Sequence, residues 1–95
     1  MITAHELLDL YELAASNDLI VDGIEPFRVE EDFDVPHVEL TITANEIHES
    51  NDMLSWEQRI DAMRNNIGDI LRQTQKIGGE FRFNVWVSEK TDWIA

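Results

Sequence analysis

The feature that most constrains the fold is one long amphipathic segment, residues 55–77, which carries its own start and stop signals. Residues 55–58 (SWEQ) have the pattern of a capping box, in which the Ser and Gln side chains satisfy backbone N–H groups at a helix start. Positions at alternating intervals of four and three residues, all apolar except Thr74, then run as far as Ile77, and Gly78-Gly79 follows. The segment therefore predicts a single helix of about six turns.

The apolar stripe of this helix permits two kinds of packing. It can cover a sheet formed by the same chain, or it can form a coiled-coil seam with a second helix. Thr74 at a seam position and the lack of another helix of matching length favour packing within the chain. Gly68 costs helix stability, which predicts a close packing contact at that position. Dimerisation through this helix or through a sheet edge stays open as the alternative.

A shorter helix is predicted near the N-terminus. Residues 3–6 (TAHE) form another capping box with Thr3 as the N-cap, and residues 7–14 place Leu, Tyr and Ala side chains at helical spacing. Residues 16–18 (SND) are a stop signal, because Asn tolerates the left-handed backbone conformation found at helix ends.

Residues 24–43 have the alternation of a β-hairpin. Apolar residues alternate with charged ones over residues 27–33, and with Glu and Thr over residues 38–42, which is the period of a half-buried strand. The turn is expected near residues 34–36 (DVP), between the two alternating runs.

Two further extended stretches flank this hairpin and the long helix. Residues 19–21 predict a short extended piece that ends at the turn signal Asp22-Gly23. Residues 81–88 predict the last strand, with Phe and Val on one face and Trp86 among the polar residues of the other. The order of elements is thus α-β-β-α-β.

The predicted fold class is α+β, a three-stranded, mainly antiparallel sheet with two helices over one face. A chain of 95 residues makes one domain, residues 1–95, with a single core. A core of this size leaves little room for a deep substrate cavity.

The net negative charge of the chain is confined to its acidic half, residues 1–58. This half holds fifteen Asp or Glu and a single basic residue, Arg28, for a formal charge of −14, whereas residues 59–95 are near-neutral at +1. The net charge of −13 predicts repulsion from nucleic acid and anionic membranes, and attraction to basic proteins. Crowded carboxylates also repel one another, which is expected to raise the pKa of several of them.

The leading functional hypothesis is a non-catalytic acidic inhibitor or DNA-mimic decoy that masks the basic, nucleic-acid-binding surface of a partner protein. In size and acidity the chain resembles the small anti-defence and host-takeover proteins of bacteriophages, some of which mimic DNA. The working face is expected on the first helix and the hairpin, centred on residues 30–34. The residues expected to bind the partner are Asp9, Glu12, Glu30, Glu31, Asp32, Asp34, Glu39 and Trp86.

The alternative hypothesis is a small structural or accessory subunit that assembles through the helix at 55–77 and exposed Trp side chains, Trp86 and Trp93. A small metal-dependent hydrolase is a third and weaker hypothesis. It depends on residues 48–52 (HESND), which resemble a zinc-protease HExxH motif but end in Asp where a second His is needed.

No other motif points to catalysis. The chain has no cysteine, no phosphate loop, no dinucleotide fingerprint and no Gly-x-Ser-x-Gly elbow, so we expect no enzymatic activity, no cofactor and no metal. The sequence also has no signal peptide and no apolar run that could span a bilayer. These features predict a cytoplasmic protein, in the cytoplasm of the host cell if the source is viral.

Overall fold

The computed structural model describes residues 1–42 and 55–92, and its elements follow the predicted α-β-β-α-β order. The elements are α1 (Ala4–Ala15), β1 (Leu19–Val29), β2 (Asp34–Pro36), the 3-10 turn η1 (Val38–Leu40), α3 (Trp56–Ile77), β3 (Phe81–Glu89) and the 3-10 turn η2 (Lys90–Asp92). The three strands form one antiparallel sheet in the order β2-β1-β3. The α+β fold class is therefore confirmed.

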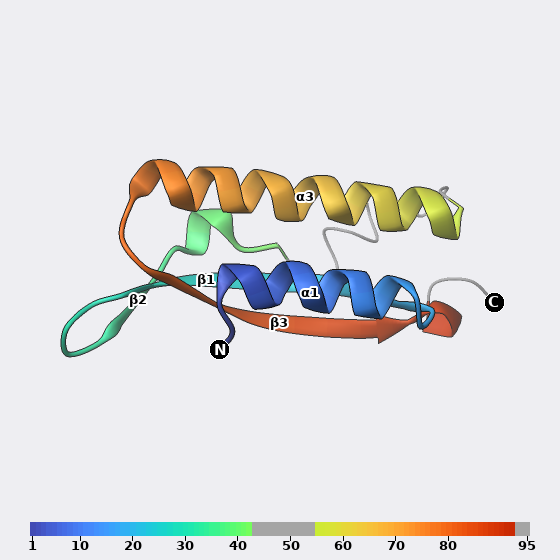
Figure 1. The fold of residues 1–95 in the computed structure, drawn as a ribbon, viewed down its shortest axis with the longest axis horizontal. Coiled ribbons are helices and arrows are strands. Elements are labelled where there is room, and N and C mark those ends of the chain that lie inside the picture. The colour runs from blue at the N-terminus through green and yellow to red at the C-terminus, as the bar shows by residue number, and fades with distance from the viewer. Residues whose placement is uncertain (43–54, 93–95) are drawn as a thin grey trace.

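The two helices lie side by side on the sheet. α1 packs across β1 and β3, while α3 packs beside α1 and over β1 (Figure 1). α1 and β3 run in the same direction, and α3 runs back against them (Figure 1). The core lies between these layers and centres on Leu7, Ile24, Met63, Ile67 and Phe83, which are almost completely buried.

Both helices begin at the predicted capping boxes. In α1 the Thr3 hydroxyl accepts a hydrogen bond from the Glu6 N–H at 3.1 Å, and the Glu6 carboxylate accepts one from the Thr3 N–H at 3.0 Å. Ser55 and Gln58 make the same reciprocal pair in α3. α1 ends near Ser16 as predicted, although the residue with left-handed backbone is Asp18 (φ 56°).

The apolar stripe of α3 is covered by the sheet and by α1 of its own chain. The buried residues along this face are Trp56, Arg59, Met63, Ile67, Ile70 and Thr74. The face that a coiled-coil seam would use is thus already packed. The close contact predicted at Gly68 is wrong, because among the described residues a Cβ there would meet only the Arg72 guanidinium of the same helix, at 3.4 Å.

β1 is longer than the sequence predicts, because the expected turn at Asp22-Gly23 is a β-bulge inside one strand of 11 residues. Val21 pairs with Val87 and Gly23 pairs with Trp86, which leaves Asp22 as the extra residue. The buried Asp22 carboxylate accepts a hydrogen bond from the Ser88 hydroxyl.

The second strand of the hairpin lies earlier than predicted. β2 consists of the residues assigned to the turn, Asp34–Pro36, and the residues assigned to the strand form the 3-10 turn η1. Beyond η1, Ile42 makes a single bridge to Ile24, with both N–O distances at 2.9 Å. The hairpin turn therefore moves to residues 30–33, which changes the exposure of Phe33.

Candidate partner-binding site

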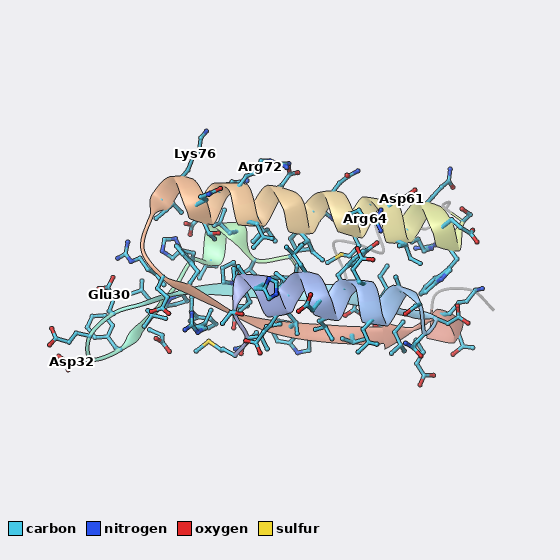
Figure 2. The ribbon with its side chains drawn as sticks, viewed as in Figure 1. Glu30, Asp32, Asp61, Arg64, Arg72 and Lys76 are labelled. Carbon is cyan, nitrogen blue, oxygen red and sulfur yellow. The ribbon has the colours of Figure 1, made fainter. Side chains whose placement is uncertain are left out.

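The β1–β2 hairpin carries its acidic turn away from the helices. The last ladder pair is Val29 with Asp34, and the Glu30 N–H then donates to the Phe33 carbonyl at 2.9 Å. Figure 1 shows this turn at one end of the long axis of the molecule, which measures 45 × 24 × 19 Å. Figure 2 shows the Glu30 and Asp32 side chains at that end, projecting outward. We call residues 30–34 the acidic tip.

Four of the eight residues predicted to bind a partner contact a basic side chain of this chain. The pairs and their N–O distances are Arg28–Glu30 (2.6 Å), Arg64–Glu12 (3.6 Å), His5–Asp9 (3.5 Å) and His37–Glu39 (2.9 Å). Arginine is always charged, so it offsets the carboxylates of Glu30 and Glu12 at every physiological pH. The two histidines do so only when protonated.

Glu31, Asp32 and Asp34 have neither an ion pair nor a side-chain hydrogen bond within the described residues, and all three are exposed. Their carboxylates repel one another and attract external cations. A basic partner can pair with them without first breaking an internal contact. The negative charge available for binding is thus concentrated at the apex of the acidic tip.

Phe33 adds apolar surface to the acidic tip. The sequence placed it on one strand face with Phe27 and Val29, but the turn leaves its side chain 67% exposed. An exposed ring among carboxylates can stack on an arginine guanidinium while the carboxylates pair with its N–H groups. Sequence reasoning missed this residue. The available signal was Glu31. It stands at a position where the alternation of the strand calls for an apolar residue, and so it marks the end of the strand.

The other predicted residues lie elsewhere. Asp9 and Glu12 lie on α1, and Glu39 lies in η1. Trp86 lies on β3 with its ring against Gly23, six residues along β1 from Val29, where the turn begins. The structure therefore brings together Glu30, Glu31, Asp32 and Asp34, and leaves the remaining four outside the acidic tip.

The carboxyl groups of Glu6 and Glu39 each have a pKa displaced downward. The pKa of Glu6 is lowered by the hydrogen bonds from the Thr3 backbone N–H and hydroxyl. The pKa of Glu39 is lowered by a hydrogen bond from its own backbone N–H and by His37. The upward displacement expected from crowding is not what these two groups show, because hydrogen bonds to the charged form dominate them.

Within the described residues, neither a metal-binding cluster nor the cleft between α1 and α3 offers an alternative site. In residues 1–42 and 55–92, no group of three or more His, Asp or Glu side chains is placed to hold a metal ion. Residues 48–52 and Trp93 lie outside the described residues. A cleft of about 320 Å³ opens between α1 and α3, lined by Ala4, Leu71, Thr74, Gln75, Gly79 and Phe81. These lining side chains offer no carboxylate or imidazole for acid–base chemistry.

None of the helices in the described part of the chain is long and apolar enough to cross a membrane. A comparison with protein-family models, curated proteins and solved structures finds no significant match. The functional assignment therefore depends on the geometry and charge of the acidic tip.

Proposed function

We propose that this protein is a non-catalytic acidic ligand that masks a basic, nucleic-acid-binding surface of a partner protein, and that the acidic tip is the contact. One observation carries the proposal. The exposed carboxylates of Glu31, Asp32 and Asp34, which have no internal partner among the described residues, flank the exposed Phe33 in the chain. Lys and Arg side chains that bind phosphates bind carboxylates by the same charge-assisted hydrogen bonds.

The overall charge density supports competition with nucleic acid. Duplex DNA carries one negative charge per about 1.7 Å of axis, so about 26 charges span the 45 Å length of this molecule. The net charge of −13 is half of that number. The protein can therefore attract a basic surface over a long range and speed the encounter, without matching the phosphates one by one.

The shape of the acidic tip selects the kind of basic surface. The tip is a hairpin of two strands, whose backbones lie about 4.8 Å apart. A narrow projection of this kind fits a concave basic groove better than a flat basic face. Occupation of the groove requires no chemistry, so the proposed activity is inhibition by exclusion.

The cellular setting follows from the partner. Because the proposed partner binds nucleic acid, we place this protein with it in the cytoplasm, which is the host-cell cytoplasm if the source is viral. The resemblance in size and acidity to phage anti-defence and host-takeover proteins supports the proposal that this protein acts during phage infection.

The test compares two variants. One loses three negative charges at the acidic tip, and the other loses three negative charges elsewhere on the surface. The tip variant is Glu31→Gln/Asp32→Asn/Asp34→Asn, and the control variant is Asp18→Asn/Glu57→Gln/Asp61→Asn. Each changes the net charge from −13 to −10. Because the substituted residues are exposed, both variants should keep their free energy of unfolding within about 0.5 kcal/mol of the wild type.

The measurement is affinity capture of proteins from a bacterial lysate at about 0.05 M and about 0.5 M salt, with duplex DNA as the competitor. We expect the wild type and the control variant to retain a nucleic-acid-binding protein at low salt and to release it at high salt or with DNA. The tip variant should retain none. Binding that resists salt, ignores DNA, or falls equally in both variants would contradict the proposal.

A further inference from the structure

β3 is an edge strand whose outer side is partly covered. Ile2 pairs there with Phe83, through an Ile2 N–H bond to the Phe83 carbonyl at 2.9 Å and a Phe83 N–H bond to the Ile2 carbonyl at 2.8 Å. Backbone polar groups alternate in direction along an antiparallel strand, so Val85 and Val87 direct theirs to the same outer side. In the part of the chain that the structure describes, no strand pairs with β3 on that side beyond Ile2.

The ladder on the inner side gives the same result independently. Ile24 faces Val85 across the β1–β3 ladder, but its N–H and C=O groups both bond to Ile42, on the far side of β1. A directly opposed pair either exchanges both bonds or neither. Val85 therefore turns its N–H and C=O away from β1, toward the outer edge.

Exposed apolar side chains gather along this edge. Trp86 and Val87 are adjacent residues of β3, so they stand on opposite faces of the sheet, and their side chains are 52% and 43% exposed. Residues 83–88 include no charged residue, no Pro and no Gly. Natural edge strands usually carry charged residues or Pro, which prevent pairing with another chain. An uncharged apolar edge without them is a template for pairing with another strand.

Leu13 of α1 is another exposed apolar residue, with 63% of its surface accessible. Glu12 contacts Arg64, which places α3 on one flank of α1, and Leu13 lies on the opposite flank, toward the outer edge of β3. α1 rises about 14 Å from Ala4 to Leu13, and β3 rises about 13 Å from Phe83 to Val87. Because α1 and β3 run in the same direction (Figure 1) and both start near the Ile2–Phe83 bridge, these rises place Leu13 and Val87 at the same level along the two elements.

We propose that a second copy of this chain occupies the edge, so that two β3 strands pair antiparallel about a two-fold axis at Val87. In this arrangement Val87 and its counterpart exchange two N–H···O=C bonds, and Val85 faces the end of the partner's β3. The two Leu13 side chains meet above the axis, and the two Trp86 rings lie on a diagonal that aromatic side chains can bridge. The result is a continuous six-stranded sheet with an isologous interface.

Charge favours a second copy over a basic partner at this edge. A basic protein is attracted to the acidic tip, whereas residues 83–88 of the β3 edge carry no charge with which it could pair. The acidic tip lies near the end of the molecule where β3 begins (Figure 1), so antiparallel pairing places the two tips at opposite ends of the dimer. The charges of the two acidic tips are then held apart rather than brought together.

The test combines the oligomeric state with amide exchange. Light scattering after size exclusion should show a dimer whose population rises over about a hundredfold range of protein concentration. High salt should strengthen the dimer, because it screens the repulsion between acidic copies, whereas it weakens binding to a basic partner. The amides of Val85 and Val87 should exchange more slowly as the dimer forms, while the amide of Asn84, which points toward β1, should not change.

Substitutions at the edge separate the interface from the fold. Leu13→Lys should raise the dissociation constant of the dimer by about tenfold or more, and Val87→Lys should give a monomer. Leu8→Lys, which changes an exposed residue on the other flank of α1, should leave the dissociation constant of the dimer unchanged. A chain that stays monomeric with freely exchanging Val85 and Val87 amides would overturn the proposal, as would protection of these amides only in a complex with a different protein.

Discussion

The indole ring of Trp86 lies over Gly23, its neighbour across the β1–β3 ladder. A Cβ placed on Gly23 would lie 2.9 Å from Cε3 of Trp86 and 3.4 Å from its Cβ, so the ring occupies the space that any side chain would need. Gly23 itself is buried and follows the bulge at Asp22. The ring therefore covers a backbone irregularity with one face and presents its other surface to solvent.

Gly23→Ala is expected to destabilise the fold by about 1–3 kcal/mol, because the added methyl group forces the Trp86 ring or the bulge to move. Urea unfolding of Gly23→Ala, Trp86→Ala and the double variant measures the coupling between them. The cost of Gly23→Ala should be much smaller in the Trp86→Ala background. Equal costs in the two backgrounds would show that the ring is not what excludes a side chain.

Gly68→Ala is expected to stabilise the protein by about 0.5–1 kcal/mol, because Gly68 lies inside α3 and glycine is a poor helix residue. The added Cβ would contact only the flexible end of Arg72, at 3.4 Å. The matched control is Gly78→Ala at the C-cap of α3, where φ is 82° and no atom of the described residues lies within 4 Å of the added Cβ. There the backbone (φ 82°, ψ 168°) lies in a region that is essentially restricted to glycine, and this alone should cost about 1–3 kcal/mol. A loss of stability in Gly68→Ala would reveal a packing role at that position.

The helices could be predicted because their signals are local, and the sheet register could not. Each helix start is a complete capping box within four residues, formed by Thr3 with Glu6 in α1 and by Ser55 with Gln58 in α3. The alternation over residues 38–42, in contrast, fits a strand equally well whether or not a partner strand lies beside it. β1 pairs instead with Asp34–Pro36, a choice that depends on packing across the whole sheet.

The candidate site was predicted only in part, because only some of its features follow from local sequence patterns. The acids of residues 30–34 are consecutive in the sequence, so their clustering needed no fold. The neutralisation of Glu12 by Arg64 joins α1 to α3, and no local pattern contains it. The exposure of Phe33 depends on where the hairpin turns, which the wrong strand assignment concealed.

The capping box of α1 predicts a specific acid dependence of stability. The pKa of Glu6 is lowered in the folded protein by the Thr3 hydrogen bonds. A carboxyl group with a lowered folded pKa contributes stability above its unfolded pKa, about pH 4.5, and that contribution is lost as the pH falls through the folded pKa. Glu6→Gln keeps the backbone hydrogen bond but does not titrate, so its stability should depend less on pH in this window than that of the wild type.

Thr3→Ala supplies the independent check on the same box. Loss of the N-cap hydroxyl should lower the free energy of unfolding by about 1 kcal/mol at neutral pH, because the Glu6 N–H loses its acceptor. An NMR titration of Glu6 in this variant should show its pKa moving upward, toward the ordinary value. An unchanged pKa, together with an acid dependence of Glu6→Gln identical to that of the wild type, would contradict the assigned cause.

Tyr11 joins the two helices, and its ionisation should weaken that contact at alkaline pH. Its hydroxyl donates to the Ile60 carbonyl at 2.6 Å, and burial raises the pKa of the phenol above its ordinary value. A raised folded pKa means that the stabilising contribution is complete below the unfolded pKa, about pH 10, and is lost as the pH rises through the folded pKa. Tyr11 is the only tyrosine of the chain, so phenolate absorbance reports this group alone.

Tyr11→Phe separates the hydrogen bond from the packing of the ring. The variant keeps the buried ring but leaves the Ile60 carbonyl without its donor, so it should unfold about 1 kcal/mol more easily than the wild type at neutral pH. The difference in stability between the two proteins should shrink above pH 10, because the wild type loses the same hydrogen bond when Tyr11 ionises. Lysine titration affects both proteins equally and cancels in this difference. A constant difference through the alkaline range, or a phenolate that forms below its ordinary pKa, would show that the buried hydrogen bond does not control the titration of Tyr11.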